Sequence, residues 1–112
     1  MNISKQLRYT TLNSKKEISN VFKNGKKIKS EVGPVYLFNE KENKDSKFAI
    51  LIKSDIGKAY YRNYIKRIIR FYIRTNTTMF EKFNRVIFLY NYKKKKIDYS
   101  FLKANYDTSF NK

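Results

Sequence analysis

The chain contains no cysteine and no histidine among its 112 residues. Disulfide bonds, thiolate chemistry, zinc-finger sites and imidazole general bases are therefore excluded. Apolar runs are short, and none approaches the roughly 20 residues that a membrane-spanning helix needs. The first ten residues also lack the apolar core of a secretory signal peptide. We therefore expect a cytoplasmic protein that does not enter a membrane.

Acidic residues are scarce as well. Nine Asp and Glu residues stand against 26 Lys and Arg residues, which gives a formal net charge of +17. Such a charge favours anionic partners, and nucleic acid and an anionic membrane surface are the two candidates. The carboxylates form no paired motif, and the three glycines are too scattered for a phosphate-binding loop. We therefore assign no catalytic residue and no metal ligand to this chain.

The chain length predicts one domain over residues 1–112, and its N-terminal end reads as an irregular basic arm over about residues 1–12. Asn13 or Ser14 can then cap a short helix, because their side-chain oxygens accept bonds from the first free backbone N–H groups. Asn24–Gly25 is typical of a helix end. The first regular element is therefore expected to be a helix.

Three segments carry the pattern of β-strands. Residues 26–38 read as extended, with a break at Gly33–Pro34 because proline cannot donate to a strand ladder. Residues 47–53 are apolar on both faces and so predict a central strand. The charged residues 39–46 are expected to form a hairpin loop before that strand, and residues 85–90 form a third apolar strand.

Two further helices complete the expected fold. A basic helix covers residues 56–74 with a cap at Ser54–Asp55, and one more helical turn is expected around Phe80–Phe83. The lysines at 93–96 read as a solvated loop. Asp98 can cap a last helix that buries Phe101, Leu102 and Tyr106. The order α-β-β-α-β-α predicts an α+β fold, a two-layer α/β sandwich with a basic helix packed on a small sheet.

The helix over residues 56–74 holds four of the six arginines and no acid. Its apolar residues recur at helical spacing along one face: Tyr61, Ile65, Ile68 and Tyr72. Two polar stripes lie beside that face, one with Arg62, Lys66 and Arg70 and one with Asn63, Arg67 and Arg74. Because the sheet needs the apolar face, nucleic acid is favoured over a membrane surface as the partner of the arginines.

Aromatic side chains offer a second means of binding. Phe22, Tyr36 and Phe38 can stack on the bases of single-stranded RNA if one face of the sheet is left open. Ordinary core packing is the alternative for each of them. For Tyr36 both readings stay open, since its hydroxyl group prefers a wet edge.

The pattern G-K-A-x-x-R-N-x-x-K-R-I-I-R at Gly57–Arg70, placed after an apolar strand, resembles the arginine-asparagine-arginine signature of the bacterial ribonuclease P protein component. A short helix ending in Phe22 and Gly25 before the first strand agrees with that family, and the resemblance covers about residues 8–106. It implies a two-layer α/β sandwich shared with a ribosomal protein domain, with an unusual left-handed crossover.

The resemblance also implies a division of labour. An RNA subunit would cleave precursor tRNA, using Mg²⁺ ions held mainly by RNA. The protein would bind that catalytic RNA and hold the single-stranded 5′ leader of precursor tRNA in a central cleft. We expect the protein to be monomeric outside this ribonucleoprotein. A ribosomal or general RNA-binding protein of the same fold is the alternative, while the missing histidines and carboxylate pairs argue against a protein-only nuclease.

Site residues follow from the same resemblance and from the two polar stripes. We assign six residues to the leader cleft: Ile18, Phe22, Tyr36, Arg62, Lys66 and Arg70. Six more are assigned to contact with the RNA subunit: Lys53, Lys58, Asn63, Tyr64, Arg67 and Arg74. In the leader cleft, Ile18 stands where the family often has an aromatic residue. In the RNA-subunit contact two positions depart from the family, because Tyr64 replaces an arginine and Asp55 replaces a lysine. Both changes remove positive charge from the RNA-subunit contact, and Tyr64 can stack on a base instead.

Overall fold

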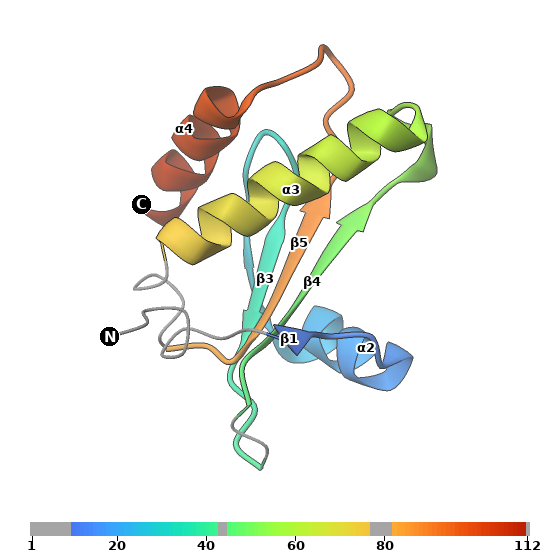
Figure 1. The fold of residues 1–112 in the computed structure, drawn as a ribbon. Helices are drawn as coiled ribbons and strands as arrows, with labels where there is room; N and C mark the ends of the chain where they lie inside the picture. Colours follow the sequence, from blue (N-terminus) through green and yellow to red (C-terminus); the bar gives the residue numbers. More distant parts are fainter. Residues whose placement is uncertain (1–9, 43–44, 77–81, 112) are drawn as a thin grey trace, which may run out of the picture.

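The computed structural model describes residues 10–42, 45–76 and 82–111. Its strands are β1 (Thr10–Thr11), β2 (Lys26–Ile28), β3 (Val35–Phe38), β4 (Lys47–Ile52) and β5 (Arg85–Tyr90). Its helices are α2 (Lys15–Asn24), the short 3-10 helix η1 (Ser54–Ile56), α3 (Ala59–Thr75) and α4 (Tyr99–Phe110). The strands form one sheet in the order β1-β4-β5-β3-β2 (Figure 1).

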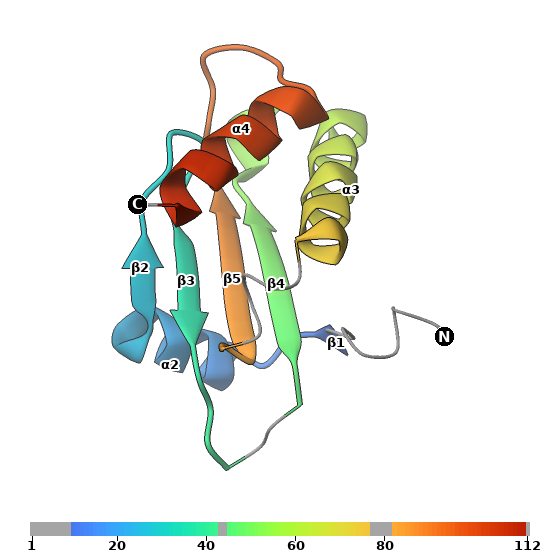
Figure 2. The same ribbon diagram turned by 90° about the vertical axis from the view of Figure 1, so that its left-hand side faces the viewer.

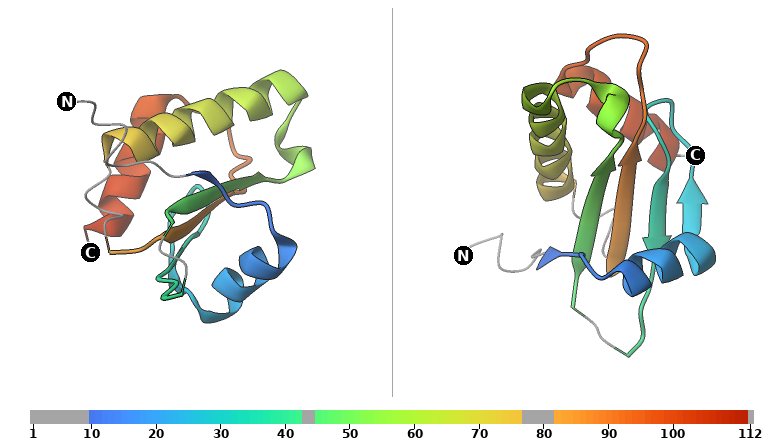
Figure 3. Two further views of the ribbon diagram at one scale, coloured as in Figure 1. Left: turned by 60° about the horizontal axis from the view of Figure 1, so that its bottom comes forward. Right: turned by 90° about the vertical axis from the view of Figure 1, so that its right-hand side faces the viewer.

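The helices cover the two faces of the sheet unequally. α3 and α4 lie on one face, and α2 covers one end of the other face (Figures 2 and 3). The larger core lies under α3 and α4 and includes Phe88, Ile69 and Tyr106. A smaller core under α2 joins Val21 to Ile87. The predicted α+β sandwich with a basic helix on a small sheet is therefore confirmed, and part of the α2 face stays open.

The middle of the sheet is β5. It pairs antiparallel with β3 and parallel with β4 along its length, whereas β4 meets β1 only at Thr10 and Thr11. The hairpin predicted at residues 39–46 is wrong, because β5 lies between β3 and β4. All β5 side chains except Leu89 are buried, while in β4 only Ala49 is. The prediction that residues 47–53 form the central strand is wrong. β4 is apolar on both faces because α3 covers one of them and the other continues the surface beside α2.

The connection from β4 through α3 to β5 is left-handed. β4 and β5 run parallel, and Figure 1 shows both pointing up with α3 in front and β5 to the left of β4. Crossovers between parallel strands are right-handed in almost all proteins. The left-handed connection agrees with the fold implied by the sequence resemblance, and it places the polar side of α3 along the β4 edge.

The helix ends follow the sequence only in part. Of the two predicted caps of α2, Asn13 and Ser14, the structure has Ser14, whose Oγ accepts a hydrogen bond from the backbone N–H of Glu17 at 3.3 Å. Gly25 ends α2 with φ −79°, outside the left-handed region. A Cβ atom at Gly25 would lie 2.5 Å from the Val21 carbonyl oxygen, so close packing is what requires glycine there.

The predicted cap and start of the basic helix are wrong. Ser54–Ile56 form η1, and α3 begins only at Ala59, with Lys58 at its N-cap and no side-chain cap bond. The extended backbone of Gly57 separates η1 from α3, so neither Ser54 nor Asp55 stands next to the first turn of α3. Asp98, in contrast, caps α4 as predicted by accepting from the Phe101 N–H at 3.0 Å.

Three smaller expectations have mixed outcomes. Residues 10–11 belong to β1, so the end of the expected irregular arm is a strand, and residues 1–9 lie outside the described residues. Phe80 also lies outside them, while Phe83 packs on the larger core and belongs to no helix. In α4, Leu102 and Tyr106 are buried as expected, whereas Phe101 is only partly buried.

A buried arginine ties α2 to the sheet. Arg85 is 1% exposed, and its Nε donates to Glu17 Oε2 on α2 at 3.1 Å. Its Nη1 also donates to the carbonyl oxygens of Asp45 and Asn84. A buried guanidinium needs such partners, because an unpaired buried charge is very costly. This arginine therefore serves the fold by fixing α2 and the residues that α2 presents.

Candidate nucleic-acid interface

α3 has one buried face, as the spacing of its apolar residues predicts. The buried side chains are Tyr61, Ile65, Ile68, Ile69, Tyr72 and Ile73. Arg62 and Lys66 flank this face and are partly buried, whereas four polar residues further round the helix are exposed: Asn63, Arg67, Arg70 and Arg74. The two predicted stripes therefore differ in their surroundings, and Arg70 shares the exposure of the second.

Lys66 reaches the edge of β4. It lines a hollow of 340 Å³ together with Lys53 and with residues of β4 and β5: Ile50, Leu51, Ile52 and Leu89. We call this the β4-edge hollow. It brings together Lys66, predicted for the leader cleft, and Lys53, predicted for the RNA-subunit contact. Two ammonium groups beside apolar strand residues suit a phosphate chain whose bases lie on the sheet.

The predicted aromatic residues gather on the α2 side. Phe22 and Tyr36 make an edge-to-face contact with ring centroids 4.7 Å apart, and Ile18 packs in the same small core. Phe22 remains 37% exposed and Tyr36 is partly buried. Lys27 Nζ lies 6.0 Å from the centre of the Tyr36 ring. Both rings are therefore packed against the protein on one side only, and each can offer part of its surface to a ligand.

The β4-edge hollow reaches the sheet surface of the aromatic pair through Leu51, whereas Ile50 and Ile52 in its lining pack on the α3 side. Tyr36 sits opposite Ile87 in the ladder, and Leu51 sits opposite Leu89, two residues further along β5. Alternate residues of a strand share a face, and neighbouring strands lie about 4.8 Å apart. A surface of roughly 10 Å across the strands therefore joins Tyr36 to Leu51. Lys66 stands at its far side.

The remaining predicted cleft residues lie apart from this hollow. Arg62 turns towards η1, where its Nη1 is 3.5 Å from the Ser54 carbonyl oxygen. Arg70 is exposed, two turns after Arg62 on α3. Neither residue lines the β4-edge hollow. Among the arginines and lysines of α3, Lys66 is therefore the one that the structure places directly beside the open sheet surface.

The other flank of α3 forms a second hollow. This tyrosine hollow has a volume of 640 Å³ and is lined by Tyr60, Tyr61, Asn63, Tyr64, Arg67, Lys96 and Ile97. It unites three residues predicted for the RNA subunit, because Asn63, Tyr64 and Arg67 all lie there. The Tyr64 ring stacks on Tyr61 with centroids 6.2 Å apart, and Arg67 Cζ lies 5.8 Å from the Tyr64 centroid.

Tyr60 and Lys96 were missed by the sequence reasoning. Tyr60 stands four residues before Tyr64, a spacing that puts both on one side of a helix, so the signal was present in the sequence. Lys96 belongs to the lysine run for which the sequence predicts a solvated loop. The four lysines are exposed, but three of them have partners: Lys93 pairs with Asp55, Lys95 Nζ lies 4.7 Å from the Phe101 centroid, and Lys96 approaches Tyr60.

Asp55, one of the two departures from the family pattern, is neutralised within the protein. The Lys93 ammonium group donates a hydrogen bond to Asp55 Oδ2. That bond holds the pKa of the Asp55 carboxyl group below its usual value, against the opposing effect of desolvation. The ion pair also ties η1 to the loop that carries Lys96, so Asp55 helps to shape the tyrosine hollow.

The last two predicted residues lie at the ends of α3. Lys58 is exposed at the N-cap, and Arg74 is exposed in the last turn. Arg74 there interacts favourably with the negative end of the helix dipole. The predicted RNA-subunit set therefore extends along the whole exposed side of α3, from Lys58 to Arg74, with Lys53 at the β4 edge.

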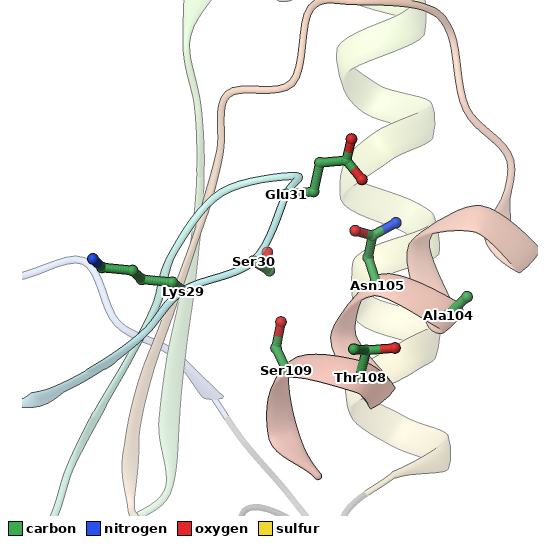
Figure 4. Close-up of a pocket in the computed structure, with 7 residues that line it drawn as sticks. All are labelled: Lys29, Ser30, Glu31, Ala104, Asn105, Thr108 and Ser109. Atoms are coloured by element: carbon green, nitrogen blue, oxygen red, sulfur yellow. The ribbon is translucent and has the colours of Figure 1, made fainter. Parts of the chain in front are cut away.

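A third hollow differs in character. It measures 530 Å³ and lies between the β2–β3 connection and α4, where Ser30 and Glu31 come from one side and Asn105 and Ser109 from the other (Figure 4). Its lining includes one lysine and one glutamate and neither an arginine nor an aromatic ring. It therefore offers one cation beside an acid and no ring on which a base could stack.

Within residues 10–42, 45–76 and 82–111, no three acidic side chains come close enough to hold a metal ion. The helices in this described part of the chain are also too short or too polar to cross a membrane. Phosphate binding and base stacking are the chemistry that the arrangement of arginines, lysines and tyrosines supports.

Known proteins are similar to this chain in sequence or in fold. The ribonuclease P protein component of Fusobacterium nucleatum is 35% identical over 66 residues, which are 59% of this chain and 59% of that protein. The ribonuclease P protein of Staphylococcus aureus has the same fold, with a TM-score of 0.80 and 18% identity over 93% of this chain and 94% of its own. That of Thermotoga maritima gives a TM-score of 0.73 and 21% identity over 91% and 96%. The family model described as Ribonuclease P matches residues 7–112, and this chain therefore belongs to the ribonuclease P family.

Proposed function

We propose that this chain is the protein subunit of ribonuclease P and assists a catalytic RNA in the endonucleolytic removal of the 5′ leader from precursor tRNA. The observation that carries the proposal is the placement of α3. One of its flanks borders an open sheet surface at Lys66, and the other borders the tyrosine hollow at Arg67. A helix with two separate cationic flanks suits two RNA ligands.

The leader of the substrate is assigned to the open sheet surface. A single strand needs aromatic faces for its bases and cations for its phosphates. Phe22 and Tyr36 supply the first, and Lys66 supplies the second at the opposite side of that surface. Ile18 supports the aromatic pair from α2. Arg62 and Arg70 extend the cationic flank at either end of Lys66.

The RNA subunit is assigned to the exposed side of α3. Arginine presents a planar fork that matches two phosphate oxygens, and Arg67 and Arg74 are both exposed there. Further polar groups along the same side come from Lys53, Lys58 and Asn63. The chain itself supplies binding and orientation, and Mg²⁺ bound by the RNA supplies the chemistry. We further propose one domain over residues 1–112, a cytoplasmic location, and a monomer outside the ribonucleoprotein.

Reconstitution tests this function. The protein is mixed with a bacterial ribonuclease P RNA and a precursor tRNA at low Mg²⁺, and cleavage is followed by gel electrophoresis. We expect the protein to stimulate cleavage by the RNA and to show no cleavage by itself. Binding to unrelated structured RNAs with equal affinity and no stimulation would instead support a general RNA-binding protein of this fold. Cleavage without RNA would mean that the chain carries its own active site.

Lys66→Ala is expected to weaken binding of leader-containing precursor tRNA to the holoenzyme by about 10- to 150-fold, because a charge-assisted phosphate contact contributes about 1.5–3 kcal/mol. Binding of mature tRNA should change little. Arg62→Ala should likewise weaken binding of precursor tRNA more than binding of mature tRNA. The matched control is Lys103→Ala, which removes an exposed lysine of α4. An equal loss for precursor and mature tRNA would refute the assignment of the leader to this flank.

A further inference from the structure

The tyrosine hollow has an aromatic wall that the fold does not require. Tyr60 is 65% exposed, and its ring makes no core contact comparable to that of Tyr61, which is buried. Tyrosine, with an apolar ring and a polar hydroxyl group, is enriched at binding interfaces. The hollow of 640 Å³ lies within the range of about 300–1,000 Å³ that small ligands occupy.

Cations stand around this wall at close range. Lys96 Nζ lies 5.6 Å from the ring centroids of both Tyr60 and Tyr61, and 3.5 Å from the Tyr60 hydroxyl group. Arg67 stands over Tyr64 on the other side of the hollow. The aromatic faces suit a flat ring system, and the two cations suit an anionic group attached to it. Both features together are typical of a nucleotide site.

The hollow is also preformed. The Tyr61 hydroxyl oxygen accepts a hydrogen bond from the Ile97 backbone N–H at 3.0 Å, which fixes the loop after Lys96 against α3. The ion pair of Lys93 with Asp55 holds the start of the same loop. A ligand therefore finds the tyrosines and Lys96 already in place, so that little ordering of the protein opposes binding.

We propose that the tyrosine hollow binds one unpaired nucleotide, with its base stacked on Tyr60 and its phosphate bound by Lys96 and Arg67. Asn63 borders the hollow and offers both a donor and an acceptor to the edge of the base. Within the proposed function, the nucleotide belongs to the ribonuclease P RNA, and stacking replaces the phosphate contact that an arginine at position 64 would make. An acidic peptide would use the cations but would not need the exposed ring.

A single tryptophan can report on this site. The chain contains no tryptophan, so Tyr60→Trp places one fluorophore in the hollow. Titration with a single-stranded RNA oligomer should quench its emission, because the base stacks on the indole ring. A blunt-ended RNA duplex of the same sequence and polyglutamate should quench it much less. Absence of quenching by the single strand would overturn the proposal, as would equal quenching by the duplex or by polyglutamate.

Affinity measurements separate stacking from charge. Tyr60→Ala should weaken binding of a bacterial ribonuclease P RNA by about 5- to 100-fold, the range for one stacked base, with no change in the salt dependence of binding. Tyr60→Phe should retain the affinity. Phe71→Ala is the matched control, since Phe71 is a 51% exposed aromatic residue of α3 outside the hollow. Thermal unfolding of each variant checks that it is folded.

The results distinguish this inference from the proposed function. If the unmodified chain binds the ribonuclease P RNA and Tyr60→Ala binds it equally well, the nucleotide site is refuted and the proposed function stands. If the unmodified chain does not bind that RNA, the proposed function fails. Quenching of the Tyr60→Trp variant by the single-stranded oligomer then still decides whether the hollow is a nucleotide site.

Discussion

Gly33→Ala is expected to lower the free energy of unfolding by about 3 kcal/mol or more. Gly33 has φ +134°, a backbone conformation that residues with a Cβ atom rarely adopt. An added Cβ would also lie only 1.9 Å from the Leu89 carbonyl oxygen. The backbone must therefore move at the point where the Leu89 N–H donates to Pro34 O and the Asn91 N–H donates to Val32 O.

Gly57→Ala is the matched control for this effect. Gly57 has an extended backbone that any residue adopts, and an added Cβ would meet the Tyr61 side chain at 3.1 Å. A movement of a few tenths of an ångström in that ring relieves the contact. Gly57→Ala should therefore lower the free energy of unfolding much less than Gly33→Ala does. Urea denaturation followed by circular dichroism gives both values. Equal stability of the two variants would show that the strand connection tolerates a side chain at position 33.

Periodicity was sufficient to predict the part of the fold that rests on local sequence. The apolar residues of α3 recur every three or four positions, a spacing that places them on one face of a helix. This spacing predicts the buried face of α3, and Tyr61, Ile65, Ile68 and Tyr72 are all buried. The caps at Ser14 and Asp98 were also predictable, since each depends on an oxygen that stands next to the first turn. Local patterns of this kind need no knowledge of distant segments.

Strand order and helix start could not be obtained in the same way. β4 and β5 are both apolar on two faces, and which of them is central depends on where β1 and β3 add to the sheet. The start of α3 depends on the turn at Gly57, which leaves Ser54 and Asp55 in η1 instead of at the cap. The pairing of the buried Arg85 with Glu17 joins residues far apart in the chain, and a lone arginine at the start of a strand does not indicate it.

The candidate site shows the same limit. The two polar stripes of α3 were visible in the sequence, but their surroundings were not. Lys66 meets the sheet because the left-handed crossover lays that flank of α3 along β4, and Lys96 meets Tyr60 because the loop after β5 returns over α3. Both contacts are products of topology. The hollows, rather than the stripes, are therefore what the structure adds to the functional argument.

The double substitution Arg67→Gln and Arg74→Gln is expected to weaken binding of a ribonuclease P RNA by about 100-fold or more. Both side chains are exposed on α3, and each charge-assisted hydrogen bond to phosphate contributes about 1.5–3 kcal/mol. Loss of two phosphate contacts should also reduce the slope of log K against log salt by about 1.4–1.8. Filter binding at several salt concentrations measures both quantities.

A charge-matched control decides whether position or total charge causes the loss. Lys29→Gln with Lys41→Gln also removes two exposed positive charges, but from loops away from α3. If binding depends on the net charge of +17 alone, the two double variants will lose equal affinity and equal salt dependence. A much larger loss from α3 requires direct contacts, because long-range attraction between exposed charges is screened within about 10 Å at 0.1 M salt. The assignment of the RNA subunit to the exposed side of α3 therefore depends on this difference.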